Sequence, residues 1–471
     1  MSSEVPRPRP SSTLVLLRQG QAGQVEALML LRADRGDQNS LRWVFPGGLI
    51  DASDGQLRTQ FQDLDDAVAS ARLGVVNGGL DYWTAALRET LEEAGLLLAH
   101  DAAGRPVDAA AHAQALQDWR GALHAVPRGQ GGAAFAELCR AHGWRLQGDA
   151  VVPFAHWITP LGMPKRFDTR FFVAAAPAQA VSVDGIEIVE HRWVAVQDLA
   201  AEQGGIAIRG PTLAVARDLA RHADVDAMLA WARGVGVVPA VHPRMATDAR
   251  GQRQSIAPWH AAYAEVGRFD PKGRGNVRSF IRPGEVAELV AGRLLRITAP
   301  QPGGTSGPGI NSYLLHADAQ DWVLIDPGPD DAAHAQAITA ALHERGGRLA
   351  AVLATQWPAG APPAARFPPQ RRPGNGERLD FGGGCVLRVV GPTDQAGTQL
   401  SFVHEGLWLL FCGDPLPAGS AHGDLAQPDG DRDAYLAGLR RLAQRAGAGF
   451  DAIAPGHGFL IEHPAEAPLQ T

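Results

Sequence analysis

The spacing of apolar residues divides the chain into two stretches that each mix strands with helices. In the first stretch, the apolar runs 14–17 and 25–31 predict strands, and apolar residues at helical spacing over 81–94 predict a helix. In the second stretch, short apolar runs between residues 294 and 354 predict strands, and the pattern over 332–345 predicts a helix. We therefore expect two α/β domains.

A segment rich in Gly, Pro, Arg and Ser, without a sustained hydrophobic period, separates the two stretches. An Ala-rich segment with large apolar residues at helical spacing interrupts the first one. The expected organisation is a flexible N-terminus over 1–9, a first domain over 10–237 with helical insertions near 52–80 and 101–148, a linker over 238–284, and a second domain over 285–471.

Composition narrows the classes of partner. Hydrophobic residues make up 45% of the 471 residues, which is enough for packed cores. The net charge of −7 lacks the basic excess expected of a protein that binds nucleic acid or anionic membranes, and no apolar run reaches the length of a membrane span. Three widely separated cysteines suggest neither a disulfide framework nor a cysteine zinc site. We expect a cytoplasmic protein that acts on a small molecule.

The predicted helix over 81–94, which Asp81 can begin and Gly95 can end, has two contrasting faces. One face is apolar and carries Trp83, Leu87, Leu91 and Ala94. The opposite face carries three carboxylates: Glu89, Glu92 and Glu93. Like charges one turn apart repel, and carboxylates in the last turn oppose the helix dipole. The cluster is therefore either an ordinary solvated face or a site for a hard divalent cation such as Mg²⁺.

A strand that ends in Phe45-Pro46-Gly47-Gly48 precedes this helix, and two glycines allow a close approach of the backbone to a ligand. The combination resembles the Nudix box, G-x5-E-x7-R-E-U-x-E-E-x-G-U. Its opening glycine is Gly48, and its second half is matched by Arg88, Glu89, Glu92, Glu93, Gly95 and Leu96, with Thr90 at a hydrophobic position. Asp54 stands in place of the first glutamate. Thirty-three residues separate it from Arg88 where the pattern has seven, so 26 residues are inserted.

The insertion, with the later segments 156–160 (HWITP) and 166–172 (RFDTRFF), is similar to the branch of Nudix enzymes related to coenzyme A diphosphatases. The resemblance implies an α/β/α sandwich that hydrolyses a diphosphate linked to another group with Mg²⁺ or Mn²⁺. It also implies roles for the matching residues: metal ligation by Glu89, Glu92, Glu93 and the Gly47 carbonyl, with Arg88 orienting a carboxylate. Either one of these carboxylates or a later glutamate, Glu187 or Glu190, would act as the base. Arg166 and Arg170 are candidates for binding phosphate.

Residues 285–471 resemble the metallo-β-lactamase fold, an αββα sandwich, in the branch of lactamase-beta-2-like hydrolases. The matching segments are 302–314 (PGGTSGPGINSYL), 324–328 (LIDPG), 413–414 (GD) and 455–458 (PGHG). Active members carry the ligand motif T-H-x-H-x-D-H after a buried strand. Here the corresponding positions, together with those of the later ligands, hold Gln356, Pro358, Gly360, Ala361, Gln395, Asp414 and His457. Two remaining ligands cannot form a catalytic zinc site, so we expect a non-catalytic domain without zinc.

Two functions remain open from the sequence. The leading hypothesis is a divalent-metal-dependent hydrolase that cleaves the diphosphate of a nucleoside diphosphate conjugate, with coenzyme A or acyl-coenzyme A as the first candidates. The alternative is a binding or regulatory protein that recognises such a conjugate without turnover. The second domain could form a homodimer, bind the distal part of the substrate or hold a product. No nucleic-acid or membrane partner is expected.

Overall fold

The computed structural model forms two compact units, residues 1–242 and 243–471. The described residues are 6–36, 40–123, 125–127, 129–203, 205–206, 208, 210–299, 309–356, 367–368, 370–391, 400–413 and 450–462. Within these ranges, no helix is both long enough and apolar enough to cross a membrane.

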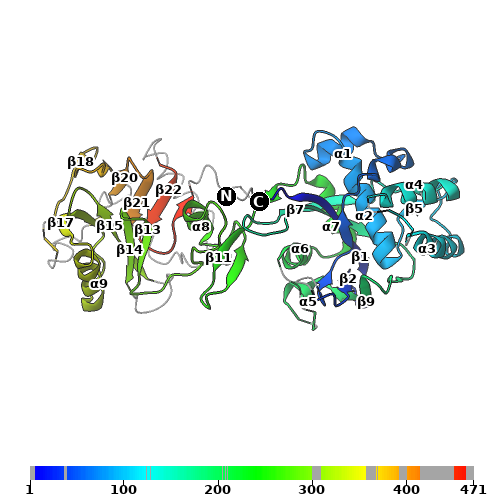
Figure 1. Cartoon of the computed structure of the whole chain (residues 1–471), viewed down its shortest axis with the longest axis horizontal. Helices are drawn as coiled ribbons and strands as arrows, with labels where there is room; N and C mark the ends of the chain where they lie inside the picture. The colour runs from blue at the N-terminus through cyan, green and yellow to red at the C-terminus, as the bar shows by residue number, and fades with distance from the viewer. Residues whose placement is uncertain are drawn as a thin grey trace. The chain divides into compact units, whose positions relative to one another are not determined.

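The first unit is built on an eight-stranded mixed sheet (Figure 1). Its order is β10-β7-β8-β1-β2-β3, with β4 also paired to β1 and β9 to β2. The strands are β1 (Arg9–Gln19), β2 (Val25–Arg32), β3 (Trp43–Val44), β4 (Gly47–Leu49), β7 (Val152–Ile158), β8 (Phe167–Ala175), β9 (Ile188–Ala195) and β10 (Ala240–Val241). Strand β1 is central, because it runs parallel to β8 and antiparallel to β2 and β4.

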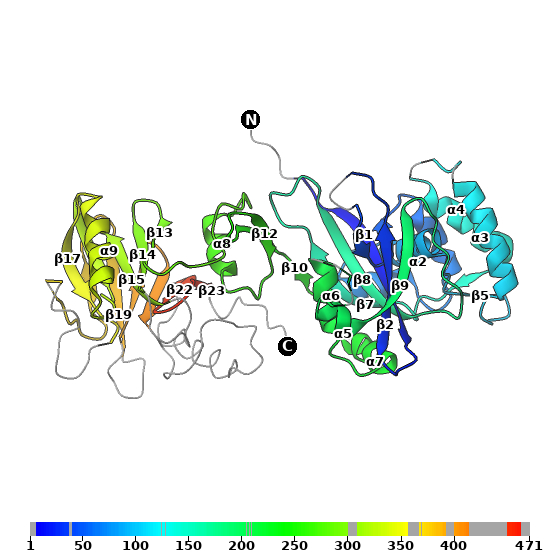
Figure 2. The same cartoon turned by 90° about the horizontal axis from the view of Figure 1, so that it is seen from below.

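Helices cover both faces of this sheet, which confirms the α/β/α class (Figures 1 and 2). Alternate residues of a strand point to opposite faces, and Leu14, Leu16 and Phe172 share one core with the apolar side of helix α2 (Gly79–Ala94). The opposite face is covered by helices α5 (Val196–Ala200), α6 (Pro211–Leu219) and α7 (Val225–Gly234).

The two predicted helical insertions pack against each other beside α2. The first contains η1 (Asp54–Gln60) and α1 (Asp66–Leu73). The second contains α3 (Ala109–Leu123) and α4 (Gly131–His142), flanked by the short strands β5 (Ala99–His100) and β6 (Arg145–Leu146). The Arg145 guanidinium donates to the Gln60 side chain at 3.2 Å, and the Trp83 indole of α2 donates to the Val151 carbonyl at 2.9 Å.

The second unit contains two sheets packed face to face. The five-stranded sheet comprises β13 (Val286–Val290), β14 (Leu294–Ala299), β15 (Ile310–His316), β16 (Asp321–Ile325) and β17 (Arg348–Leu353). The six-stranded sheet comprises β18 (Arg378–Asp380), β19 (Val386–Val390), β20 (Ser401–His404), β21 (Leu409–Gly413), β22 (Ala452–Pro455) and β23 (Ile461–Glu462). One core joins the inner faces of both sheets, and helix α9 (Ala332–His343) packs on the outer face of the first sheet.

Most of the segment that the sequence predicts as a linker belongs to the second unit. Residues 243–284 form a hairpin of β11 (Arg244–Thr247) and β12 (Arg253–Ile256), followed by helix α8 (Tyr263–Phe269). Glu265 of α8 is buried and forms two hydrogen bonds, of 2.6 and 3.1 Å, with the buried Arg296 guanidinium of β14. The segment is therefore an ordered part of this unit. Composition does not reveal this order, because the two charged residues of a buried ion pair count as polar residues in the sequence.

Candidate active site

Helix α2 carries the carboxylates that the sequence singles out. It begins at Gly79, two residues before the predicted start. The carboxylate of Asp66 accepts hydrogen bonds from the backbone N–H groups of Gly78 and Leu80, both at 3.0 Å, which satisfies donors at the helix start. The predicted N-cap, Asp81, instead pairs with Arg58 at 2.9 Å. Gly95 ends the helix as predicted, in the left-handed region at φ +67°.

The three glutamates do not form a solvated face. Glu93 is 3% exposed, and the side chains of Glu89 and Glu92 are 16% and 22% exposed. The apolar residues on the other side of the helix are buried in the core, as predicted. Carboxylates that are this far removed from water need compensating positive charge.

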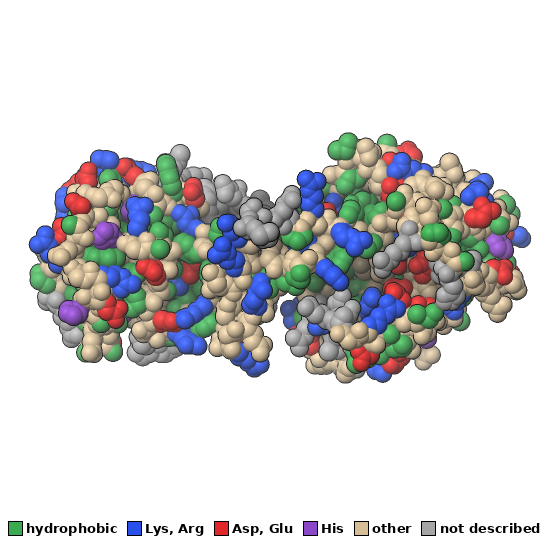
Figure 3. All heavy atoms as spheres, in the orientation of Figure 1, with side chains coloured by type: hydrophobic (Ala, Val, Ile, Leu, Met, Phe, Trp, Pro, Cys, Tyr) green, Lys and Arg blue, Asp and Glu red, His purple; other side chains and the backbone are tan. Residues whose placement is uncertain are grey.

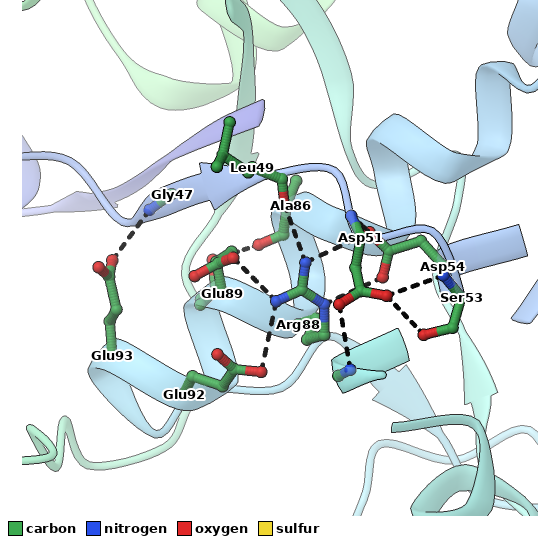
Figure 4. A network of polar contacts seen from close by, with 12 residues as sticks. Gly47, Leu49, Asp51, Ser53, Asp54, Ala86, Arg88, Glu89, Glu92 and Glu93 are labelled. Atoms are coloured by element: carbon green, nitrogen blue, oxygen red, sulfur yellow. Dashed lines mark hydrogen bonds and ion pairs between the residues drawn. The ribbon is translucent and has the colours of Figure 1, made fainter. Parts of the chain in front are cut away.

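The Arg88 guanidinium lies at the centre of a buried polar network (Figure 4). It donates two hydrogen bonds to Asp54, at 3.0 and 3.2 Å, and one to the Leu49 carbonyl at 3.0 Å. It also contacts the carboxylates of Glu89 and Glu92, at 2.8 and 3.4 Å. Asp54 is fully buried. The fold thus brings Asp54 against Arg88 despite the 33 residues between them.

Gly47 and Gly48 allow β4 to approach the helix closely. The Gly47 backbone N–H donates to the Glu93 carboxylate at 2.9 Å. A Cβ on Gly48 would lie 2.3 Å from the Glu89 carboxyl carbon, and one on Gly47 would lie 2.4 Å from the Ser12 carbonyl oxygen. Glycine is therefore required at Gly47, where the obstructing atoms belong to the backbone, and a side chain at Gly48 would displace the Glu89 carboxylate.

Negative charge exceeds positive charge in this buried cluster. Burial raises the pKa of Glu92 to about 8, with the neighbouring Glu89 adding to the effect. Burial also raises the pKa values of Glu89 and Glu93, and raises that of Asp54 to about 6 against the opposing effect of Arg88.

The carboxylates of the three glutamates do not converge on one point, and no set of three potential ligands gathered to hold an ion occurs among the described residues. Glu89 and Glu92 turn toward Arg88, and Glu93 turns toward Gly47 (Figure 4). The donor set nevertheless fits a hard divalent cation, which prefers carboxylate oxygens and would supply the missing positive charge.

Of the two later glutamates, the structure brings Glu187 toward the cluster. The Glu187 charge contributes to the raised pKa values of both Glu89 and Glu93, and its carboxylate pairs with Arg35 at 2.8 Å. Glu190 instead pairs with Arg192 at 2.7 Å on strand β9, with both side chains more than 40% exposed.

Sequence reasoning did not include Arg32, whose charge counteracts the raised pKa of Glu93. The signal in the sequence that could have identified Arg32 is its position at the end of the apolar run that forms β2.

In the space-filling view, acidic side chains gather in the middle of the visible face of the first unit, with basic side chains beside them (Figure 3).

Comparison with known proteins relates part of the first unit to a known family. Residues 58–204 match the NUDT19 Nudix domain family. This part of the first unit is similar to a Nudix domain. The match lies within the unit that holds the acidic helix, and it includes both helical insertions except for the first residues of η1.

One curated relative and several solved structures are similar to parts of the chain. The acyl-coenzyme A diphosphatase NUDT19 of Gallus gallus is 27% identical over 214 residues, which cover 36% of this chain and 53% of that protein. The chain thus spans about half the length of this relative. A Nudix hydrolase from Alicyclobacillus acidocaldarius is 24% identical with a TM-score of 0.39, covering 50% of this chain and 98% of that one. A beta-lactamase domain protein from Burkholderia ambifaria is 17% identical with a TM-score of 0.29, covering 40% and 73% respectively.

The two arginines predicted to bind phosphate lie on or beside strand β8 of the first unit. Arg170 is buried and donates to the Leu73 carbonyl at the end of α1, at 2.8 Å, with its guanidinium carbon 5.8 Å from the centre of the Tyr82 ring. Arg166 donates to the carbonyls of Thr159 and Pro6, at 3.0 and 2.9 Å. These hydrogen bonds tie backbone segments together, and phosphate binding by either arginine stays a prediction.

In the second unit, the predicted degenerate site is described in part. Gln356 is exposed, and His457 is 9% exposed and lies opposite Ile310 in a β-bridge. Next to Gln356 in the chain, Thr355 donates hydrogen bonds to the partly buried Asp326 carboxylate from its backbone N–H, at 2.7 Å, and from its hydroxyl, at 3.0 Å. The remaining predicted positions lie outside the described residues: Pro358, Gly360, Ala361, Gln395 and Asp414.

Proposed function

We propose that the Nudix domain hydrolyses the diphosphate of a nucleoside diphosphate conjugate in the presence of Mg²⁺ or Mn²⁺. The observation that carries this proposal is the buried cluster of three glutamates on α2, which has Arg88 as its one contacting cation among the described residues. Coenzyme A and acyl-coenzyme A are the foremost substrates, because the curated relative is an acyl-coenzyme A diphosphatase and the insertion in the box of this chain resembles the branch related to coenzyme A diphosphatases.

Each residue of the cluster has a distinct part in the proposed mechanism. Glu89, Glu92 and Glu93 would hold the ion, with the Gly47 carbonyl as a further ligand. When bound, the ion neutralises charge on the diphosphate and lowers the pKa of the attacking water. Arg88 donates to Glu89 and Glu92 and so fixes the directions of their carboxylates.

We assign the base to Glu187. Its charge acts on Glu89 and Glu93, and its carboxylate pairs with the exposed Arg35 and not with Arg88. Glu187 would take a proton from water as the water oxygen attacks phosphorus. The bond from phosphorus to the bridging oxygen then breaks, and the bridging oxygen leaves on the second phosphate.

The alternative is a regulatory protein that binds the same conjugate without turnover. Burying several carboxylates around one arginine raises their pKa values and opposes folding at neutral pH. A binder of nucleotide conjugates has no need of this arrangement, whereas a metal-dependent hydrolase does. The cluster therefore favours the enzyme.

We propose that the second unit does not hydrolyse and binds no zinc. Gln356 replaces a family ligand, and the sequence places Pro358, Gly360 and Ala361 at three more ligand positions. One bound zinc ion per full-length chain after dialysis, located in this unit by loss on substitution of His457, would contradict this assignment.

Cleavage of a substrate panel tests the proposed hydrolase. The full-length protein is incubated with coenzyme A, acyl-coenzyme A, NADH, ADP-ribose and diadenosine polyphosphates, with and without Mg²⁺ or Mn²⁺. We expect metal-dependent cleavage at the diphosphate, and a loss of more than about 100-fold in kcat for Glu93→Gln. Metal-dependent binding of one conjugate without turnover would establish the regulatory alternative.

A further inference from the structure

The loop that leads into Asp54 is held by the start of helix α4, which lies about 80 positions later in the chain. The carboxylate of Asp51 accepts the Ser53 backbone N–H at 2.8 Å and the Gly131 backbone N–H at 3.1 Å. The Ser53 hydroxyl accepts the Ala133 backbone N–H at 2.9 Å. Two backbone donors of the first turn of α4, which no residue within the helix can satisfy, are therefore satisfied by the loop.

Direct packing reinforces these hydrogen bonds. A Cβ on Gly132 would lie 2.5 Å from the Asp54 backbone nitrogen and 2.6 Å from its Oδ1 atom. The first turn of α4 thus rests on Asp54 with room for hydrogen only. Gly131 lies at ordinary contact distance from the network, because its Cβ would lie 3.4 Å from the Arg88 Cδ atom.

Asp54 transmits this placement to the glutamates. The Asp51 backbone N–H donates to one Asp54 carboxylate oxygen at 2.7 Å. Both carboxylate oxygens accept from Arg88, whose Nη1 atom contacts Glu89 and Glu92. Because each side chain in this series is mostly or fully buried, a shift of the loop cannot be absorbed by water.

We propose that the second helical insertion positions the metal site, with Asp51, Ser53 and Gly132 as positioning residues that fix Asp54 and, through it, Arg88. This inference rests on the proposed metal-dependent function and assigns a role to an element outside the box itself. Contacts behind metal ligands typically affect metal affinity by 10- to 100-fold, so the role is measurable as a binding constant.

The decisive comparison is between Gly132→Ala and Gly121→Ala in the full-length protein. Both add one methyl group to a helix of the same insertion, but a Cβ on Gly121 meets nothing within 4 Å. Mn²⁺ binding is measured directly, by electron paramagnetic resonance of the free ion, together with the melting temperature. We expect Gly132→Ala to weaken Mn²⁺ binding by about 10- to 100-fold and Gly121→Ala to leave it within about twofold. Equal Mn²⁺ affinity in the two variants would overturn the positioning role.

A second pair covers the case in which Gly132→Ala fails to fold. Asp51→Asn removes a carboxylate that holds α4, whereas Asp101→Asn removes one that accepts from the Ala103 and Arg105 backbones in an exposed turn of the same insertion. We expect only Asp51→Asn to require more Mn²⁺ for half-maximal activity, with KM unchanged at saturating Mn²⁺. A wild-type protein that binds Mn²⁺ but cleaves nothing on the panel would refute the hydrolase, while the binding comparison would still decide the positioning role.

Discussion

Replacing Asp54 by the glutamate of the Nudix box is expected to harm this protein. The family residue adds one methylene at a side chain that is fully buried. Gly132 already leaves no room for a methyl group beside Asp54, and Arg88 contacts both carboxylate oxygens at 3.0 and 3.2 Å. Inserting a methylene into a packed site costs about 1–3 kcal/mol. At roughly 2–4 °C per kcal/mol for a domain of this size, Asp54→Glu should lower the melting temperature of the first unit by roughly 2–12 °C.

The assay is thermal unfolding of the full-length protein with and without Mn²⁺. The melting temperature of the unit that binds the ion rises with ion concentration, which identifies the transition of that unit. Asp226→Glu is the matched control. It adds the same methylene to an exposed aspartate of helix α7 in the same unit and is expected to change stability by less than about 0.5 kcal/mol. Asp54→Glu should also weaken Mn²⁺ binding, because the longer side chain pushes Arg88 toward Glu89. If Asp54→Glu melts and binds Mn²⁺ like the wild type, the packing argument is wrong.

Three further predictions concern single carboxylates. Glu187→Gln should lower kcat by about 10²- to 10⁴-fold. The control Glu190→Gln, which alters an exposed ion pair, should keep the wild-type kcat. Similar kcat values for the two variants would show that Glu187 is not the base. Glu265→Ala should destabilise the second unit by about 3–5 kcal/mol in chemical unfolding because it breaks a buried ion pair, against less than about 1 kcal/mol for the exposed Glu405→Ala; equal losses would mean that α8 is a dispensable part of the unit. Burial raises the pKa of Asp326 to about 6, and the hydrogen bonds from Thr355 oppose this rise. Between about pH 4 and pH 6 the folded state therefore holds a proton that the unfolded chain has lost, so the free energy of unfolding should fall as the pH rises through this range. Asp326→Asn should abolish that fall and raise the melting temperature of the second unit at pH 8, and an unchanged pH profile would count against it.

The parts of the site that the sequence predicts are those with a local pattern. The face of α2 that carries Glu89, Glu92 and Glu93 follows from helical periodicity, and the close approach of Gly48 follows from the absence of a side chain. The burial of the glutamates does not follow from periodicity, because a periodic pattern identifies opposite faces without showing what covers the polar one. In the structure, β4 and the Arg88 network cover it.

Contacts between distant segments have no such signal. Asp51 and Gly131 are 80 positions apart, and neither belongs to a repeated pattern, so their pairing emerges only when the two insertions are packed. The same holds for Glu265 and Arg296 in the second unit, 31 positions apart. Composition predicts a linker for this polar segment because it reports the average character of residues, whereas one buried ion pair is enough to fix a helix.

The interrupted box shows why a motif can accept an insertion without losing its geometry. Lengthening the connection between Asp54 and Arg88 from seven to 33 residues adds only about 1.4 kcal/mol of loop-closure entropy, since this cost grows with the logarithm of length. The inserted residues offset that cost locally, because Asp65 caps α1 and Asp66 accepts hydrogen bonds from the start of α2. The carboxylate in the Asp54 position then needs a separate support, because the short turn of the uninterrupted box is gone. Helix α4 provides this support through Gly131, Gly132 and Ala133. The two insertions are therefore coupled: the first lengthens the connection, and the second fixes its starting point.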